Sequence, residues 1–175
     1  MEYTVQHEAQ QNVVVPLSAE ADERRERMAN AIEQLIERRR DVVVVYCELA
    51  GFDRYDNAEV VHPKLRKLCQ SMMDYTALGH FEIYERIISG NERRSQVRDV
   101  ATKAYPPLAD TTDILVDFND KYDVLDERDS MKQLADDLSR LGETFATRIE
   151  LEDRILAALG RPVTESDDIE GQSVP

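Results

Sequence analysis

Basic side chains, cysteines and long apolar runs are all scarce in this sequence. Its 175 residues include 22 Lys and Arg against 36 Asp and Glu, which gives a formal net charge of −14. This excess disfavours binding to nucleic acid or to an anionic membrane, because phosphate contacts need clustered Lys and Arg. It favours a basic protein partner, or it reflects only good solubility.

No apolar run approaches the ~20 residues that a membrane-spanning helix needs. The two cysteines, Cys47 and Cys69, both lie in apolar runs, and the sequence shows no signal peptide. Such cysteines are typical of small buried side chains in a reducing compartment. We therefore expect a soluble, cytoplasmic protein with two buried thiols.

Motifs for catalysis or metal binding are also scarce. There is no glycine-rich phosphate loop and no Cys-x-x-Cys pair. A di-metal site in a helical bundle needs two Glu-x-x-His motifs and two further glutamates. The sequence has only one such motif, Glu59-Val60-Val61-His62, and we expect Pro63 to place His62 at the start of a helix. We expect no metal, no cofactor and no enzyme; a metal-dependent bundle enzyme is the less favoured alternative.

The apolar residues recur at helical spacing in four long segments. The first is expected to start at Ser18 as its N-cap residue and to end at Gly51. Its run of four valines, residues 42–45, would favour a strand by itself, because β-branched residues prefer extended backbone. The flanks continue the helical phase, so we predict a helix that is buried nearly all round at this end.

The second helix is expected from Pro63, with Gly79 kinking or splitting it and Gly90 closing it. The third covers roughly 93–123, and Pro106-Pro107 should bend or split it. The fourth runs from about Ser130 to Leu159 and is stopped by glycine and proline. Its apolar stripe comprises Met131, Leu134, Leu138, Leu141, Phe145, Ile149 and Leu156.

Four amphipathic helices joined by short loops predict an all-α protein, an antiparallel four-helix bundle with a kinked or split second helix. The bundle should comprise residues 20–159. Residues 1–19 and the acidic residues 160–175 have no periodicity, so we expect them to be flexible tails.

The stretch DYTALGHFEIYER, residues 74–86, shows two faces on a helical wheel of about 100° per residue. One face points to the core and holds Cys69, Thr76, His80, Ile83, Tyr84 and Ile87, together with Leu65, Met72 and Met73. His80 and Tyr84 are therefore predicted to be structural, with His80 as a hydrogen-bonded histidine of the bundle interior. The opposite face holds Asp74, Leu78, Phe81 and Glu85.

An aromatic beside a leucine, bordered by acids, is typical of a protein-binding patch. We interpret Asp74, Leu78, Phe81 and Glu85 as partner-binding residues. The alternative is that a neighbouring element covers Phe81.

A ladder of acids, Asp110, Asp113, Asp117 and Asp120, forms a stripe on the third helix. A separate apolar stripe on this helix contains Ile114, Leu115, Phe118, Tyr122 and Leu125. The ladder is either a solvated face or a surface for electrostatic steering of a basic partner.

Two segments resemble the Rsd/AlgQ family of bacterial anti-sigma factors. The longer match is LCQSMMDY, residues 68–75, followed by GHF-x-IYERI, residues 79–87; the weaker one is RIELEDRIL, residues 148–156. The resemblance covers roughly residues 25–159. Leu35 stands where the family commonly has a tryptophan, and Ala77 where it often has a small polar residue.

The resemblance implies an all-α bundle that binds region 4 of the housekeeping, RpoD-type sigma factor. That region is a basic helix-turn-helix domain, which contacts promoter DNA. Its sequestration would keep the sigma factor from core RNA polymerase and favour alternative sigma factors on entry to stationary phase. The family's binding surface includes the positions of Asp74 and Phe81. A signalling adaptor that uses the same surface for other proteins remains an alternative.

Overall fold

The computed structural model describes residues 17–52, 55, 57–123 and 130–160. In these residues all regular structure is helical, which confirms the predicted all-α class. The long helices are α1 (Leu17–Ala50), α2 (Ala58–Leu78), α3 (Ser95–Asp123) and α4 (Ser130–Ala158). Two short π-helical segments, η1 (Gly79–Tyr84) and η2 (Ile87–Asn91), continue α2. Residues 17–19 of the predicted N-terminal tail belong to α1, so Ser18 lies inside this helix and is not its N-cap; apart from these and Gly160, the predicted tails lie outside the described residues.

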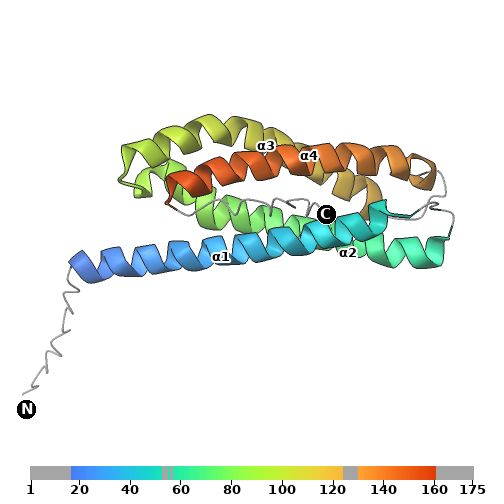
Figure 1. Ribbon diagram of the computed structural model, residues 1–175, viewed down its shortest axis with the longest axis horizontal. Coiled ribbons are helices and arrows are strands. Elements are labelled where there is room, and N and C mark those ends of the chain that lie inside the picture. The colour runs from blue at the N-terminus through green and yellow to red at the C-terminus, as the bar shows by residue number, and fades with distance from the viewer. Residues whose placement is uncertain (1–16, 53–54, 56, 124–129, 161–175) are drawn as a thin grey trace, which may run out of the picture.

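The four long helices pack side by side as an elongated antiparallel bundle (Figure 1). Each helix packs against two neighbours: α1 against α2 and α4, and α3 against α2 and α4. One end of the molecule therefore brings together four parts of the chain (Figure 1). These are the N-terminal turns of α1, the π-helical continuation of α2, the start of α3 and the C-terminal end of α4.

The valine run of α1 is helical, as its flanks predicted, but it is not buried all round. Val42 and Val45 are buried, whereas Val44 is 50% exposed, so the helix has an ordinary amphipathic pattern here. Gly51 ends the helix with an N–H bond to the carbonyl of Cys47, at 3.0 Å.

The two thiols differ, so the prediction that both are buried is wrong for one of them. Cys47 is exposed on the outer side of α1, while Cys69 is buried in the core. Burial raises the pKa of the Cys69 thiol to about 12, which leaves it protonated and unreactive.

The helix α2 begins at Ala58, about a turn earlier than Pro63 suggested. The N–H groups of Val60 and Val61 both bond to the carbonyl of Asn57, at 3.1 and 3.0 Å. Pro63 therefore lies inside the helix, where its missing N–H leaves the carbonyl of Glu59 without its usual donor. Glu59 is exposed, so water can replace that bond.

At Gly79 the helix continues as a wide turn, which is the bend that the sequence predicted. The N–H of Glu85 bonds to the carbonyl of His80, five residues earlier, as in a π-helix. Gly79 permits this turn, since a Cβ there would lie 2.9 Å from the Cε2 and Oη atoms of Tyr84. Gly90, with φ of 89°, ends the segment as expected.

The helix α3 passes Pro106 and Pro107 without a break, and Figure 1 shows it curved along its length. Each proline removes one backbone hydrogen bond. The carbonyls that lose their donors belong to Thr102 and Lys103, whose side chains are exposed, so water can satisfy them. The double proline therefore bends the helix and does not split it.

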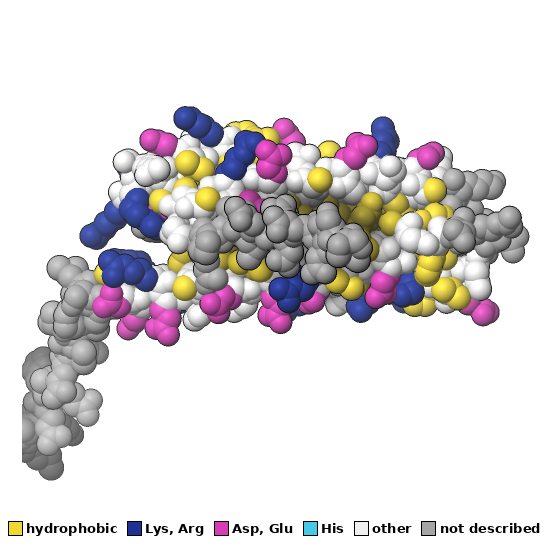
Figure 2. Space-filling model, in the orientation of Figure 1, with side chains coloured by type: hydrophobic (Ala, Val, Ile, Leu, Met, Phe, Trp, Pro, Cys, Tyr) yellow, Lys and Arg dark blue, Asp and Glu magenta, His cyan; other side chains and the backbone are white. Residues whose placement is uncertain are grey.

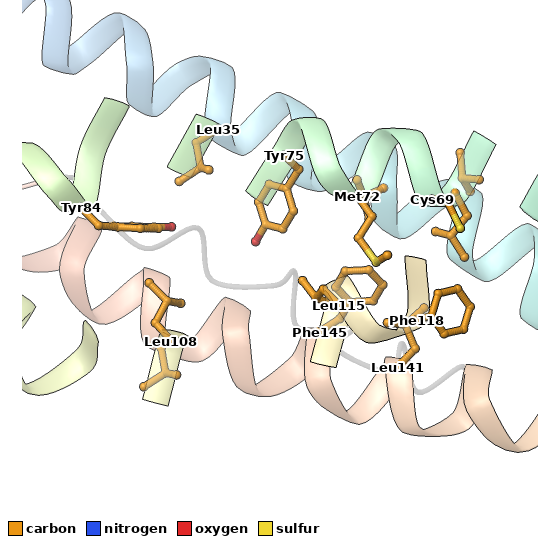
Figure 3. Close-up of a cluster of buried hydrophobic side chains, with 14 of the residues drawn as sticks. Leu35, Cys69, Met72, Tyr75, Tyr84, Leu108, Leu115, Phe118, Leu141 and Phe145 are labelled. Atoms are coloured by element: carbon orange, nitrogen blue, oxygen red, sulfur yellow. The ribbon is translucent and has the colours of Figure 1, made fainter. Parts of the chain in front are cut away.

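The core lies along the bundle axis and receives side chains from all four helices (Figure 3). Leu35, Leu49, Leu65, Leu68, Met72, Ile83, Ile87, Leu115 and Leu134 are completely buried. Leu115, Phe118 and Tyr122 of the predicted apolar stripe on α3 are buried, but Ile114 is 47% exposed among the acids. Leu125 and the side chain of Met131 lie outside the described part of the chain.

Tyr46 of α1 packs against α4 at Gly142. The Tyr46 hydroxyl donates to the carbonyl of Leu138 at 3.0 Å, and its ring packs edge-on against Phe145. A Cβ on Gly142 would lie 2.2 Å from the Tyr46 oxygen and 3.0 Å from its Cζ atom. Glycine is therefore required here by packing.

We predict that Gly142→Ala lowers the free energy of unfolding by about 1–3 kcal/mol, because the methyl group overpacks this contact. In an unconstrained helix the same change would stabilise the protein by about 0.5–1 kcal/mol. Urea unfolding of Gly142→Ala, Tyr46→Phe and the double variant measures the coupling. Part of the lost stability should return in the double variant, and a more stable Gly142→Ala protein would contradict the prediction.

Candidate functional site

The face predicted to bind a partner is exposed, with Phe81 as its largest apolar side chain. Phe81 is 59% exposed, and Asp74 and Glu85 are exposed at either end of the face. Leu78 is half-buried and packs against the core, so it contributes less free surface than predicted. No described residue covers Phe81, although whether this face binds a partner remains a prediction.

Two rings support Phe81 from behind. Phe81 contacts His80 edge-on, with 4.7 Å between ring centroids, and His80 stacks on Tyr105 of α3 at 6.1 Å. The Tyr105 hydroxyl lies 3.4 Å from Nδ1 of His80. His80 is half-buried, so it lies at the edge of the core between α2 and α3 and not in the bundle interior, where the sequence placed it.

Beneath this surface lies a buried polar network centred on Glu152 of α4. Its carboxylate is fully buried and accepts hydrogen bonds from the hydroxyls of Tyr75, at 2.5 Å, and Tyr84, at 2.7 Å. The two hydroxyls point toward a common space between the helices (Figure 3). Tyr84 is almost completely buried, on the face that the sequence assigned to the core. Burial, and then the negative charge of Glu152, raise the pKa of both tyrosines well above its usual value.

The charge of Glu152 is balanced by two arginines. Nε of Arg148, one helical turn earlier, lies 3.0 Å from Glu152, and both side chains are almost completely buried. Burial lowers the pKa of Arg148, but Glu152, Tyr75 and Tyr84 together outweigh this effect and the net shift is upward. Arg39 of α1 is 3.8 Å from Glu152 and donates to Asp153 at 2.7 Å.

The same network extends to α3. The Nη1 atom of Arg148 donates to the hydroxyls of Thr111, at 3.1 Å, and Thr112, at 2.9 Å. The guanidinium also faces the Tyr75 ring, with 5.3 Å to its centroid. One buried ion pair therefore connects all four long helices and fixes the wide turn that carries Phe81.

Sequence reasoning assigned no role to Arg39, Arg148 or Glu152, although their positions gave a signal. Arg39 falls in the helical phase between Leu35 and Val42, and Arg148 and Glu152 fall in the phase of Phe145 and Leu156. Charged residues within an apolar stripe are buried only when they are paired. This combination could have predicted a buried ion pair, but not its partners on other helices.

The four predicted steering acids, Asp110, Asp113, Asp117 and Asp120, are all exposed on α3, as the stripe required. Asp110 and Asp117 border a shallow groove between α3 and α4, where Ile114 is the exposed apolar side chain. On the α4 side the groove is bordered by Arg140, Glu143, Thr144 and Thr147. Their role in steering a partner stays a prediction.

Across the described ranges, no three His, Cys, Asp or Glu side chains come together in a way that could hold a metal ion. Glu59 is exposed and His62 half-buried in the first turns of α2. Nor does any helix in the described part of the chain have an apolar stretch long enough to cross a membrane.

The comparisons with known proteins agree on one family. A family model described as regulator of RNA polymerase sigma(70) subunit, Rsd/AlgQ, matches residues 16–160. A protein named Regulator of sigma D from Yersinia enterocolitica is 31% identical over 129 residues, which cover 71% of this chain and 77% of the relative. Proteins of the same name from Yersinia pseudotuberculosis and Salmonella paratyphi B are 30% identical over 71% of this chain, and over 76% and 78% of their own lengths. No solved structure matches the chain.

We predict that Glu152→Gln lowers the free energy of unfolding by about 3–5 kcal/mol, because it leaves Arg148 buried without its counter-charge. Asp153→Asn is the matched control: it alters the neighbouring half-buried carboxylate, and should cost about 1 kcal/mol. Chemical unfolding of both variants measures the difference. Equal losses would show that the buried pair is not the dominant contact.

The raised pKa values of Tyr75 and Tyr84 predict that the protein loses stability at alkaline pH. In the unfolded chain these tyrosines ionise near their usual pKa of about 10, whereas in the fold they stay protonated. Their contribution is therefore fully present below about pH 10 and is lost as the pH rises above it. Urea unfolding at increasing pH should show this decline, with a smaller slope in Tyr84→Phe. An unchanged slope in that variant would contradict the assignment.

Proposed function

The chain belongs to the Rsd/AlgQ family of regulators of the RNA polymerase sigma(70) subunit, and on this premise we propose how it engages its partner. As an anti-sigma factor of this family, it binds region 4 of the housekeeping, RpoD-type sigma factor. The contact is made by the exposed face of Asp74, Leu78, Phe81 and Glu85.

The exposure of Phe81 is the observation that carries this proposal. Aromatic side chains that become desolvated in a complex are among the most frequent hot spots of protein interfaces. Phe81 is 59% exposed in the free protein, while His80 behind it is held against Tyr105. The ring is therefore presented by a supported helix and loses little conformational freedom on binding.

The charges around Phe81 suit a basic partner. Asp74 and Glu85 stand at the two ends of the face, and the chain as a whole carries a formal net charge of −14. A sigma region that binds promoter DNA presents Arg and Lys side chains, which these carboxylates can pair with at the edge of the contact. The exposed acids Asp110, Asp113, Asp117 and Asp120 would then act at longer range, by raising the rate of encounter.

Binding alone accounts for the regulatory effect, and the proposed mechanism needs no catalytic step. An anti-sigma factor seated on region 4 occupies the surface with which the sigma factor contacts promoter DNA. The sigma factor is then held away from core RNA polymerase and DNA, and alternative sigma factors gain access to the polymerase in stationary phase. The negative surface also opposes direct binding of this chain to duplex DNA.

The test is Phe81→Ala, which should weaken binding to purified sigma(70) factor by roughly thirtyfold or more, the equivalent of about 2 kcal/mol. Its thermal stability should barely change, because the side chain is mostly in water. Val60→Ala is the matched control: Val60, near the start of α2, is also an exposed apolar residue, at 46%, but it lies outside the candidate face.

Isothermal titration calorimetry of both variants decides the point. If Phe81→Ala binds the sigma factor as tightly as the native chain, or if both variants lose affinity equally, the partner binds elsewhere. A large fall in the melting temperature of Phe81→Ala would instead show that the ring supports the fold.

A further inference from the structure

A second surface lies at the end of the bundle where α1 begins. Three segments meet there: the first turns of α1, the connection between η2 and α3, and the last residues of α4. They border a groove with an apolar part formed by Met28, Ile32 and Leu159. Figure 2 shows dark blue side chains gathered at this end of the molecule, with magenta ones beside them.

The groove is basic although the chain is acidic. Its thirteen lining residues include one acid, Glu92, and six arginines. These are Arg24, Arg25, Arg27, Arg86, Arg93 and Arg94. In a chain with 22 basic residues and a net charge of −14, so many arginines around one groove are not explained by solubility.

Three of the arginines already have carboxylate partners. Arg25 pairs with Asp22 at 3.0 Å, Arg86 with Glu82 at 2.6 Å, and Arg94 with Glu92 at 2.9 Å. Arg94 also donates to the carbonyl of Leu159 at 3.4 Å, so it helps to close the end of α4. These three arginines have a structural contact of their own.

The other three have no carboxylate partner within the part of the chain that the structure describes. Arg24 and Arg93 are exposed, and Arg27 donates only to the carbonyl of Glu23, at 3.3 Å. Arg24 and Arg27 are three residues apart, so they point from the same side of α1. Arg93 stands on the connection that leads into α3, which also borders the groove.

We propose that this groove binds a small anion that carries more than one phosphoryl group. Guanidinium groups hold phosphate through paired N–H donors, and this geometry suits phosphate better than a single point charge does. A ligand with two or more phosphoryl groups offers a separate anionic group to the arginines of α1 and to Arg93, which line the same groove. The apolar part of the groove leaves room for a nonpolar or aromatic portion of the same molecule.

A nucleic acid is the less favoured occupant. The arginines are confined to one end of the bundle, and the exposed acids elsewhere would repel a long polyanion. A small anion needs only the groove itself.

Calorimetric titration of the full chain with inorganic diphosphate tests the proposal, with a nucleoside triphosphate and a single-stranded oligonucleotide as parallel arms. Arg24→Gln combined with Arg93→Gln should weaken diphosphate binding by at least about tenfold, since each change replaces a charged guanidinium by a shorter, neutral amide. Arg38→Gln, an exposed arginine of α1 outside the groove, is the control and should bind as the native chain does. Tighter binding of the nucleoside triphosphate than of diphosphate would support contact with the apolar part.

Three results would overturn the proposal: no saturable binding of diphosphate, an equal loss of affinity in the groove variant and in Arg38→Gln, or binding of the oligonucleotide alone. The melting temperature of each variant without ligand shows whether the fold is intact. This test involves no sigma factor, so its outcome is separate from that of the Phe81 experiment.

Discussion

The buried carboxylate of Glu152 is the contact on which the arrangement of the helices depends. A buried charge destabilises a fold by several kcal/mol unless it is paired and hydrogen-bonded. Here the two tyrosine hydroxyls, of Tyr75 and Tyr84, and the guanidinium of Arg148 all have to reach it. These groups come from different parts of the chain, so a shift of one helix along another would break at least one contact. The network therefore selects one register of the bundle, which apolar packing alone leaves less sharply defined.

This register determines which side chains of the π-helical segment are exposed on the surface. Tyr84 reaches Glu152 only because the helix widens after Gly79, where no side chain blocks its ring. The wide turn lies directly under Phe81, which consequently points outward with His80 and Tyr105 behind it. Tyr84, which contacts the buried network, and Phe81, which is exposed, thus lie on opposite sides of the same short segment. A change in the network is expected to move the candidate surface as well as to destabilise the fold.

The sequence was sufficient to predict the helices and the outward face, because both follow from the 3.6-residue period. The sequence was insufficient to predict which residues far apart along the chain contact each other in the core. Arg39, Arg148 and Glu152 lie in the apolar phase of their helices, but the period does not say which tyrosines face them. The half-buried position of His80 was missed because the wheel assumed regular turns through Gly79, whereas the π-helical segment changes the phase. Val44 and Cys47 each lie two residues after a buried valine, Val42 or Val45, and so on the outer side of α1, a pattern that the continuous apolar run obscured.

The candidate sigma-binding face and the arginine groove are neighbours. An upper limit can be set on how much a ligand in the groove would change the affinity of the face for the sigma factor. They are connected by the ion pair between Glu82, the residue after Phe81, and Arg86, which lines the groove. Both side chains are more than a third exposed, and an exposed pair one helical turn apart contributes about 0.3–0.5 kcal/mol. An anion that drew Arg86 away from Glu82 would therefore change the affinity for the sigma factor by no more than about two- to threefold through this contact. The buried network does not extend to the arginines of the groove, so it supplies no stronger connection within the described residues. On these magnitudes, we expect the two proposed sites to bind their ligands almost independently.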